Sequence, residues 1–101
     1  MSKTDLHVIV YKLLRYVYEF NRHGILPDLM NAHDLVPVPE RYFNQAVREL
    51  SYGGFVRWTF LPCMEITLKG DEFLTENRQM QKARDFLGIE FEARLSGLFI
   101  Q

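Results

Sequence analysis

The sequence contains little cysteine and almost no net charge. A single cysteine, Cys63, among 101 residues excludes an internal disulfide framework and a zinc site built from several cysteines. The 12 lysine and arginine residues nearly balance the 13 aspartate and glutamate residues, so the formal net charge is −1. Strong nonspecific attraction to nucleic acid requires many unbalanced cations. We therefore expect any positively charged face to be a local patch.

A long uncharged apolar run is also missing. The most apolar stretch, from Val8 to Phe20, contains Lys12, Arg15 and Glu19, which argues against a membrane span. The first five residues include an acid where a signal peptide has apolar residues. The 48% hydrophobic and 25% charged residues are typical of one globular domain, and the low cysteine content fits a reducing compartment. We therefore expect a cytoplasmic protein without a membrane partner.

No set of residues has the spacing of a catalytic or metal site. The three histidines, His7, His23 and His33, lack the spacing of zinc ligands, both with one another and with Cys63. The acidic residues are scattered, and no glycine-rich loop suited to phosphate is present. We therefore expect no enzymatic activity, no catalytic residues, no cofactor, no metal and no small-molecule substrate.

Helical periodicity predicts three helical segments in the first half of the chain. A first helix is expected to begin after a cap at Thr4 or Asp5 and to end near Gly24. One or two helical turns are predicted over residues 27–32. A longer helix is predicted from Pro39 to about Tyr52, with a core stripe at i, i+3, i+4 and i+7 formed by Phe43, Ala46, Val47 and Leu50.

The second half begins with a predicted hairpin. Residues 55–60 are rich in β-branched and aromatic side chains, a turn is expected at residues 61–63, and residues 64–67 alternate like a return strand. Thr67 is expected to cap a further helix that extends to Asn77. The tail, residues 78–101, has helical periodicity, and Gly88 either is tolerated within one helix or divides it into two.

This order of elements predicts a winged helix-turn-helix, an α+β and mainly helical fold with a three-helix core and a two-stranded wing. We expect residues 1–77 to form it, with residues 78–101 as a C-terminal helical extension of the same domain. The segment that follows the hairpin reads Ile66-Thr67-Leu68-Lys69-Gly70-Asp71-Glu72-Phe73-Leu74. In this segment we expect Gly70 to permit close approach to the sheet, and Phe73 and Leu74 to enter the core.

This segment resembles the L-T-x-K-G-x-x-[Y/F]-L closing motif of winged-helix proteins. It is similar in particular to the small YjcQ family of phage and prophage proteins. Residues 43–50 and 52–56 also resemble that family's third helix, glycine and first wing strand, so the resemblance covers about residues 5–85. The resemblance implies a winged-helix fold and no established reaction.

The helix predicted over residues 39–52 has a polar face suited to a DNA groove. Arginine reads guanine, and asparagine or glutamine reads adenine, through paired donors and acceptors. The candidate nucleic-acid-binding residues are Arg41, Asn44, Gln45 and Arg48 on this helix and Arg57 on the wing. Two alternatives stay open, because Glu40 and Glu49 would repel phosphate: an ordinary solvated helix face, or a winged-helix module that binds a protein partner without binding DNA.

The apolar residues exceed what one small core needs. The candidate residues for a dimer or partner interface lie on the first helix and on the tail: Tyr11, Tyr18, Leu87, Phe91, Leu95 and Leu98. One interpretation is a homodimer in which tails and first helices exchange contacts, as regulators that bind two half-sites require. The other is that the tail packs across the first helix of its own chain.

Overall fold

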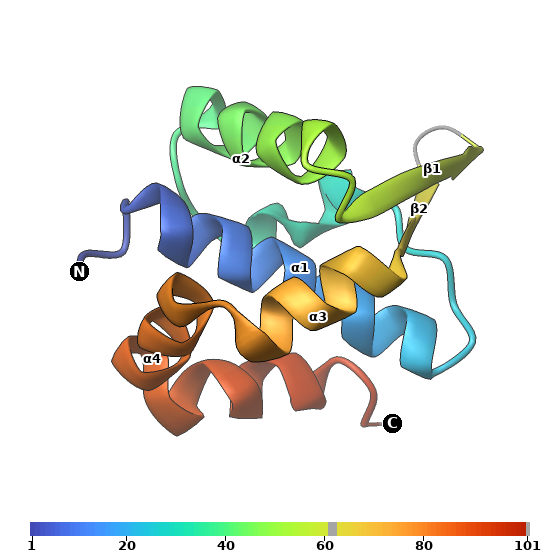
Figure 1. Cartoon of the computed structure of the whole chain (residues 1–101). Helices are drawn as coiled ribbons and strands as arrows, with labels where there is room; N and C mark the ends of the chain where they lie inside the picture. Colours follow the sequence, from blue (N-terminus) through green and yellow to red (C-terminus); the bar gives the residue numbers. More distant parts are fainter. Residues whose placement is uncertain (61–62, 101) are drawn as a thin grey trace.

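The computed structural model describes residues 1–60 and 63–100, and it is an α+β fold dominated by helices (Figure 1). Its one sheet, within these residues, is a two-stranded antiparallel hairpin. The elements are α1 (Leu6–Arg22), the 3-10 helix η1 (Leu29–Asp34), α2 (Glu40–Tyr52), β1 (Val56–Phe60), β2 (Cys63–Ile66), α3 (Leu68–Glu76) and α4 (Arg78–Gly97). The mainly helical α+β class predicted from the sequence is therefore confirmed.

Helix α1 forms the centre of the molecule, with α2 on one side and α3 and α4 on the other (Figure 1). Of the two caps predicted for it, Asp5 is the one used, since its side chain accepts a hydrogen bond from the amide of His7 at 2.8 Å. Several α1 side chains are completely buried: Val8, Ile9, Leu13, Leu14 and Val17. Burial on more than one face explains why apolar residues spread beyond a single stripe of this helix.

Helix α2 lies across α1 with the predicted stripe turned inward. Phe43, Ala46 and Leu50 are at most 1% exposed, and Val47 is half-buried. The ring of Phe43 also stacks on His33 of η1, with the ring centres 3.9 Å apart. These contacts fix the orientation of α2 and leave its opposite face to solvent.

The hairpin follows α2 directly. Val56 pairs with Ile66, and Trp58 pairs with Met64. A single bridge joins Asp28 to Cys63, and the amide of Met64 donates to the carbonyl of Pro27 at 3.3 Å. The segment before η1 therefore runs antiparallel beside β2. Positions 61 and 62 of the predicted turn lie outside the described residues.

Helix α3 starts at the predicted cap. The hydroxyl of Thr67 accepts from the amide of Gly70 at 3.0 Å. A Cβ atom at Gly70 would lie 2.0 Å from the carbonyl oxygen of Phe55, so the close approach expected at this glycine is present. Leu74 is buried, whereas Phe73 is half-buried and stacks on Phe55 with ring centres 4.1 Å apart.

Gly88 divides the tail. Its φ of 63° and ψ of −156° lie far from helical values, so α4 is two helical segments joined by a kink. Only glycine adopts such a combination without strain. Of the two alternatives left open for the tail, the divided helix is the one observed.

Candidate nucleic-acid interface

The four α2 residues predicted to contact DNA lie together on the outer face of that helix. Arg41, Asn44, Gln45 and Arg48 are all exposed. At 3.6 residues per turn, Arg41 and Arg48 point in nearly the same direction, opposite the buried stripe. Tyr52 extends the same line and is 86% exposed. The helical spacing of these residues therefore puts them on one common surface of α2.

The two acids of α2 lie to either side of this line. Glu40 and Glu49 project about 90° from the arginine direction, on opposite flanks of the helix. Glu49 lines a pocket with Leu6, Phe73 and Met80, on the flank that faces the start of α1 and the α3–α4 junction. The carboxylates therefore reduce the positive charge of α2 without interrupting the line of its arginines.

The two arginines of α2 differ in their surroundings. The guanidinium of Arg41 donates to the hydroxyl of Tyr42 at 3.0 Å and lies 4.8 Å from the centre of that ring. Arg48 makes no ion pair with any residue among 1–60 and 63–100. Arg41 forms no ion pair within these residues either, so both charges are available to a ligand, and Arg48 in addition lacks the contact with Tyr42.

The hairpin is attached to the end of α2. The indole N–H of Trp58 donates to the hydroxyl of Ser51 at 3.1 Å, on the flank of α2 that also carries Asn44. Arg57, the predicted wing contact, is 69% exposed but forms an ion pair with Glu65 on the facing strand. Any phosphate contact by Arg57 must therefore compete with this carboxylate.

One exposed aromatic residue of this surface was not predicted. Phe60 is 64% exposed, and it alternates with Val56 and Trp58 along β1. Val56 and Trp58 share one face of the strand, whereas a register irregularity between Trp58 and Phe60 interrupts the alternation at that point. Val56 is buried in the core, whereas Trp58 is 39% exposed and donates to Ser51 of α2. The position of Phe60 next to the predicted turn is the sequence signal that could have identified it, because the end of a short hairpin has little to pack against.

The predicted interface residues divide into two groups. Tyr11, Phe91 and Leu95 are at most 4% exposed, because the second segment of α4 packs on α1 of the same chain. These three residues therefore belong to the core and offer no free surface to a second copy. Tyr18 and Leu87 are half-buried against this core, and Leu98 is 50% exposed.

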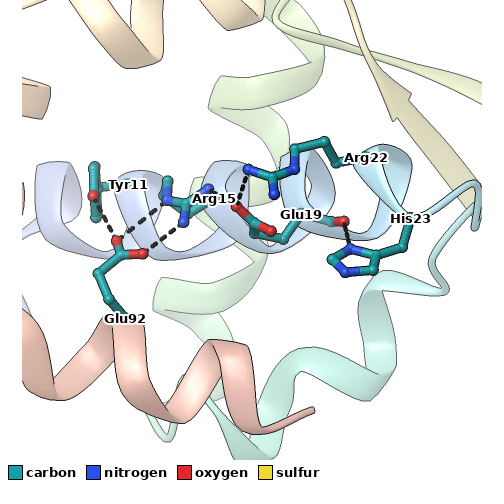
Figure 2. A network of polar contacts seen from close by, with 6 residues as sticks. All are labelled: Tyr11, Arg15, Glu19, Arg22, His23 and Glu92. Carbon is teal, nitrogen blue, oxygen red and sulfur yellow. Dashed lines mark hydrogen bonds and ion pairs between the residues drawn. The ribbon is translucent and has the colours of Figure 1, made fainter. Parts of the chain in front are cut away.

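A polar network joins the tail to α1 beside these residues (Figure 2). Arg15 lies between Glu92 at 2.6 Å and Glu19 at 2.9 Å, and the hydroxyl of Tyr11 donates to Glu92 at 3.1 Å. Burial opposes the charge of Arg15, but its two carboxylate partners outweigh burial and raise its pKa. Burial, followed by the charge of Glu92, raises the pKa of Tyr11 to about 12. The network is structural, since it fastens the two helices together.

Neither a metal cluster nor a membrane-spanning helix is found in the part of the chain that the structure describes. Within it, no group of three or more histidine, cysteine, aspartate or glutamate side chains is arranged to hold a metal ion. In the same residues, no helix combines the length and apolarity needed to cross a membrane. Comparison with known protein families, curated proteins and solved structures found no match.

Proposed function

We propose that this chain is a winged helix-turn-helix protein that binds duplex DNA, with α2 in the major groove and the hairpin as the wing. The observation that carries the proposal is the outer face of α2, where Arg41, Asn44, Gln45 and Arg48 are exposed together. The hairpin extends from the C-terminal end of α2, on the same side of α1 as α2 and away from α4 (Figure 1).

The connections between the elements support the winged-helix part of this proposal. A short helix and a turn precede α2, and an antiparallel hairpin follows it. The isolated bridge between Asp28 and Cys63 also brings the segment before η1 beside β2. Membership of the YjcQ-like phage and prophage group belongs to the same proposal, and it is supported by the motif at residues 67–74.

The side-chain chemistry supports base recognition more than tight nonspecific binding. Arg48 can donate two hydrogen bonds to guanine, and Asn44 or Gln45 can pair with adenine. Each such contact typically discriminates by about 1–3 kcal/mol. The net charge of −1 and the paired Arg57 leave few cations for phosphate, so we expect a weak dependence on salt.

Selection from a pool of random duplexes at low salt, followed by titration of the selected sites, tests the proposal. Arg48→Ala is expected to weaken binding to a selected site by about tenfold or more. The matched control is Lys82→Ala, since Lys82 is exposed on α4, on the other side of α1. The control is expected to change affinity by less than about twofold.

Two results would contradict the proposal. One is that no duplex is enriched from the pool at about 50 mM salt, where nonspecific contacts are strongest. The other is that Arg48→Ala and Lys82→Ala weaken binding equally, because α2 would then have no special role.

A protein-interaction module is the second candidate function, and the exposed aromatic side chains favour it. Tyr52, Trp58 and Phe60 are 86%, 39% and 64% exposed at the end of α2 and on the hairpin. Aromatic residues of this kind are enriched at protein interfaces. If this candidate is correct, Tyr52→Ala is expected to abolish a partner complex, whereas the duplex selection yields no enriched site.

A homodimer remains part of the DNA-binding proposal, because two half-sites require two copies. Tyr11, Phe91 and Leu95 are buried within one chain, so the dimer surface would have to use exposed apolar residues of α4 and the residue that follows it. Ile89 and Leu98 are 88% and 50% exposed. Light scattering measures the mass of the unmodified chain and of Ile89→Glu. A monomeric mass for both proteins would contradict the homodimer.

A further inference from the structure

Lys12 is the charged residue that the fold buries. It lies in the middle of α1 and is only 6% exposed, and within residues 1–60 and 63–100 no other charged side chain is buried. The ammonium nitrogen of Lys12 is not among the fully buried polar atoms and faces a pocket, but even partial burial of a charge is unfavourable unless an opposite charge or several acceptors compensate it. The surroundings of Lys12 therefore show whether such compensation is present.

No carboxylate among the described residues forms an ion pair with Lys12. The ring of Phe91 lies 5.8 Å from its ammonium nitrogen, which provides a partial, cation–π compensation. Burial lowers the pKa of Lys12, and the nearby charges of Lys3 and Arg94 lower it further. Three cations therefore converge here, and among the described residues none of them forms an ion pair with a carboxylate.

These cations line a pocket of about 130 Å³ between α1 and α4. Its charged lining is Lys3, Lys12 and Arg94 with one carboxylate, Glu90, so three positive charges face one negative charge. Phe86 and Phe91 form its aromatic part. A cavity of about 150 Å³ is enough to hold a benzene ring, so this pocket matches the scale of a small organic molecule.

Arg94 is held in place and still has donors to spare. One of its terminal N–H groups donates to the carbonyl oxygen of Asp34 at the end of η1, at 3.2 Å. A guanidinium group has five N–H donors in a fixed planar arrangement. Arg94 can therefore keep its contact with η1 while it donates to a carboxylate or phosphate group in the pocket.

We propose that this pocket binds a small organic anion, with its carboxylate or phosphate group between Lys12 and Arg94 and an apolar or aromatic body against Phe86 and Phe91. The recessed position of Lys12 favours a small ligand over a DNA backbone, which would meet exposed side chains first. The pocket also involves α4, which lies on the other side of α1 from α2 (Figure 1). Ligand binding here does not depend on whether α2 binds DNA.

Titration of the full chain with phenyl phosphate and with benzoate, followed by calorimetry and by amide chemical shifts, tests this proposal. We expect at least one of the two anions to bind saturably below about 10 mM. The largest shifts are expected at residues 86–94 and near Lys12. Benzyl alcohol, which has the ring without the charge, is expected to bind at least about tenfold more weakly than the bound anion.

Lys12→Met tests the residue that defines the site. Methionine preserves the buried apolar stem and removes the charge at its end, so the variant is expected to fold, and its chemical shifts verify this. Affinity for the bound anion should fall by at least about tenfold, whereas Lys82→Met on the exposed face of α4 should change it by less than about twofold. Absence of saturable binding by both anions would overturn the proposal, and so would unchanged affinity in folded Lys12→Met.

Discussion

The carboxylate of Glu92 accepts a hydrogen bond from Arg15 at 2.6 Å, although 77 residues separate the two in the sequence. The same carboxylate accepts a second bond from the hydroxyl of Tyr11 at 3.1 Å. Figure 2 shows that these contacts connect the second segment of α4 to α1 at the middle of that helix. Attachment at this point places Phe91 and Leu95 in the core, so the tail is an integral part of the packing.

Replacing Glu92 by glutamine is expected to destabilise the chain. The substitution keeps the size of the side chain but removes the charge, and Arg15 is only 14% exposed, so it loses a partner that water cannot fully replace. Hydrogen bonds to charged groups contribute about 1.5–3 kcal/mol, and we expect a loss in the lower part of that range because Glu92 is 37% exposed. Urea unfolding measures the difference. Glu76→Gln, on an exposed face of α3, is the control and should change stability by less than about 0.5 kcal/mol.

The stabilisation by Glu92 is expected to disappear in acid. Burial tends to raise the pKa of this carboxylate, but the hydrogen bonds and charge of Arg15 and the hydrogen bond from Tyr11 lower it below its ordinary value of 4.5. A carboxylate with a lowered folded pKa stabilises the fold above its unfolded pKa and loses this effect as the pH falls through the folded value. The stability difference between the unmodified chain and Glu92→Gln should therefore shrink between about pH 6 and pH 2. A difference that stays constant over this range would show that packing, not charge, is responsible.

Local patterns in the sequence were sufficient to predict the helices, the hairpin and the exposed face of α2. Phe43, Ala46 and Leu50 are spaced by helical turns, and a helix with such a stripe must bury it whatever it packs against. Thr67 and Gly70 were predictable for the same reason, because a cap and a close approach each depend on a few neighbouring residues. The outward direction of Arg41 and Arg48 followed once the buried stripe was known.

Relationships between distant segments could not be predicted in this way. Periodicity shows that Tyr11 and Phe91 are apolar positions on helices, but it does not show whether the two helices belong to one chain or to two. Lys12 illustrates the same limit: in the sequence it is a charge within an amphipathic helix, and only the position of α4 makes it buried. Gly88 had two possible roles, since propensity gives the cost of glycine in a helix but not the direction of the chain after it.

Lys12→Met is expected to stabilise the chain near neutral pH. The substitution removes a partly buried ammonium group that has no carboxylate partner among the described residues and puts an apolar side chain of similar length in its place. We expect a gain of about 1 kcal/mol, measured as an increase in the free energy of unfolding. Lys82→Met, at an exposed position, should have little effect.

The gain from Lys12→Met should depend on pH. Burial and two neighbouring cations lower the pKa of Lys12 in the folded chain below its ordinary value of 10.5. The folded chain then releases this proton before the unfolded chain does, so the unmodified protein becomes more stable as the pH rises from the folded pKa towards 10.5. The advantage of the methionine variant should therefore decrease over this alkaline range, and an advantage that increases would contradict the assignment.

Gly70→Ala is expected to be strongly destabilising. An added Cβ atom would lie 2.0 Å from the carbonyl oxygen of Phe55 and 2.8 Å from the side chain of Ile66. The first contact is with backbone, so α3 would have to move away from the hairpin. Overpacking of this kind typically costs about 1–3 kcal/mol or more, and we expect thermal unfolding to shift down by at least about 8 °C. A thermal unfolding midpoint that Gly70→Ala leaves unchanged would show that α3 can move away from the hairpin without loss of stability.

Gly88→Ala tests the kink of α4, where space is not the limiting factor. Apart from Gly88, its chain neighbours and the adjacent helix backbone, no atom of the described residues lies within 4 Å of an added Cβ at Gly88, so the expected cost comes from its φ of 63° and ψ of −156°. A residue with a Cβ in that region costs about 1–3 kcal/mol. Gly97→Ala is the matched control, because Gly97 lies in the same helix, also has free space, and has no positive φ. Alanine there should be neutral or stabilising by up to about 1 kcal/mol. If both substitutions stabilise the chain, α4 can straighten through Gly88, and Phe91 and Leu95 do not need the kink to reach the core.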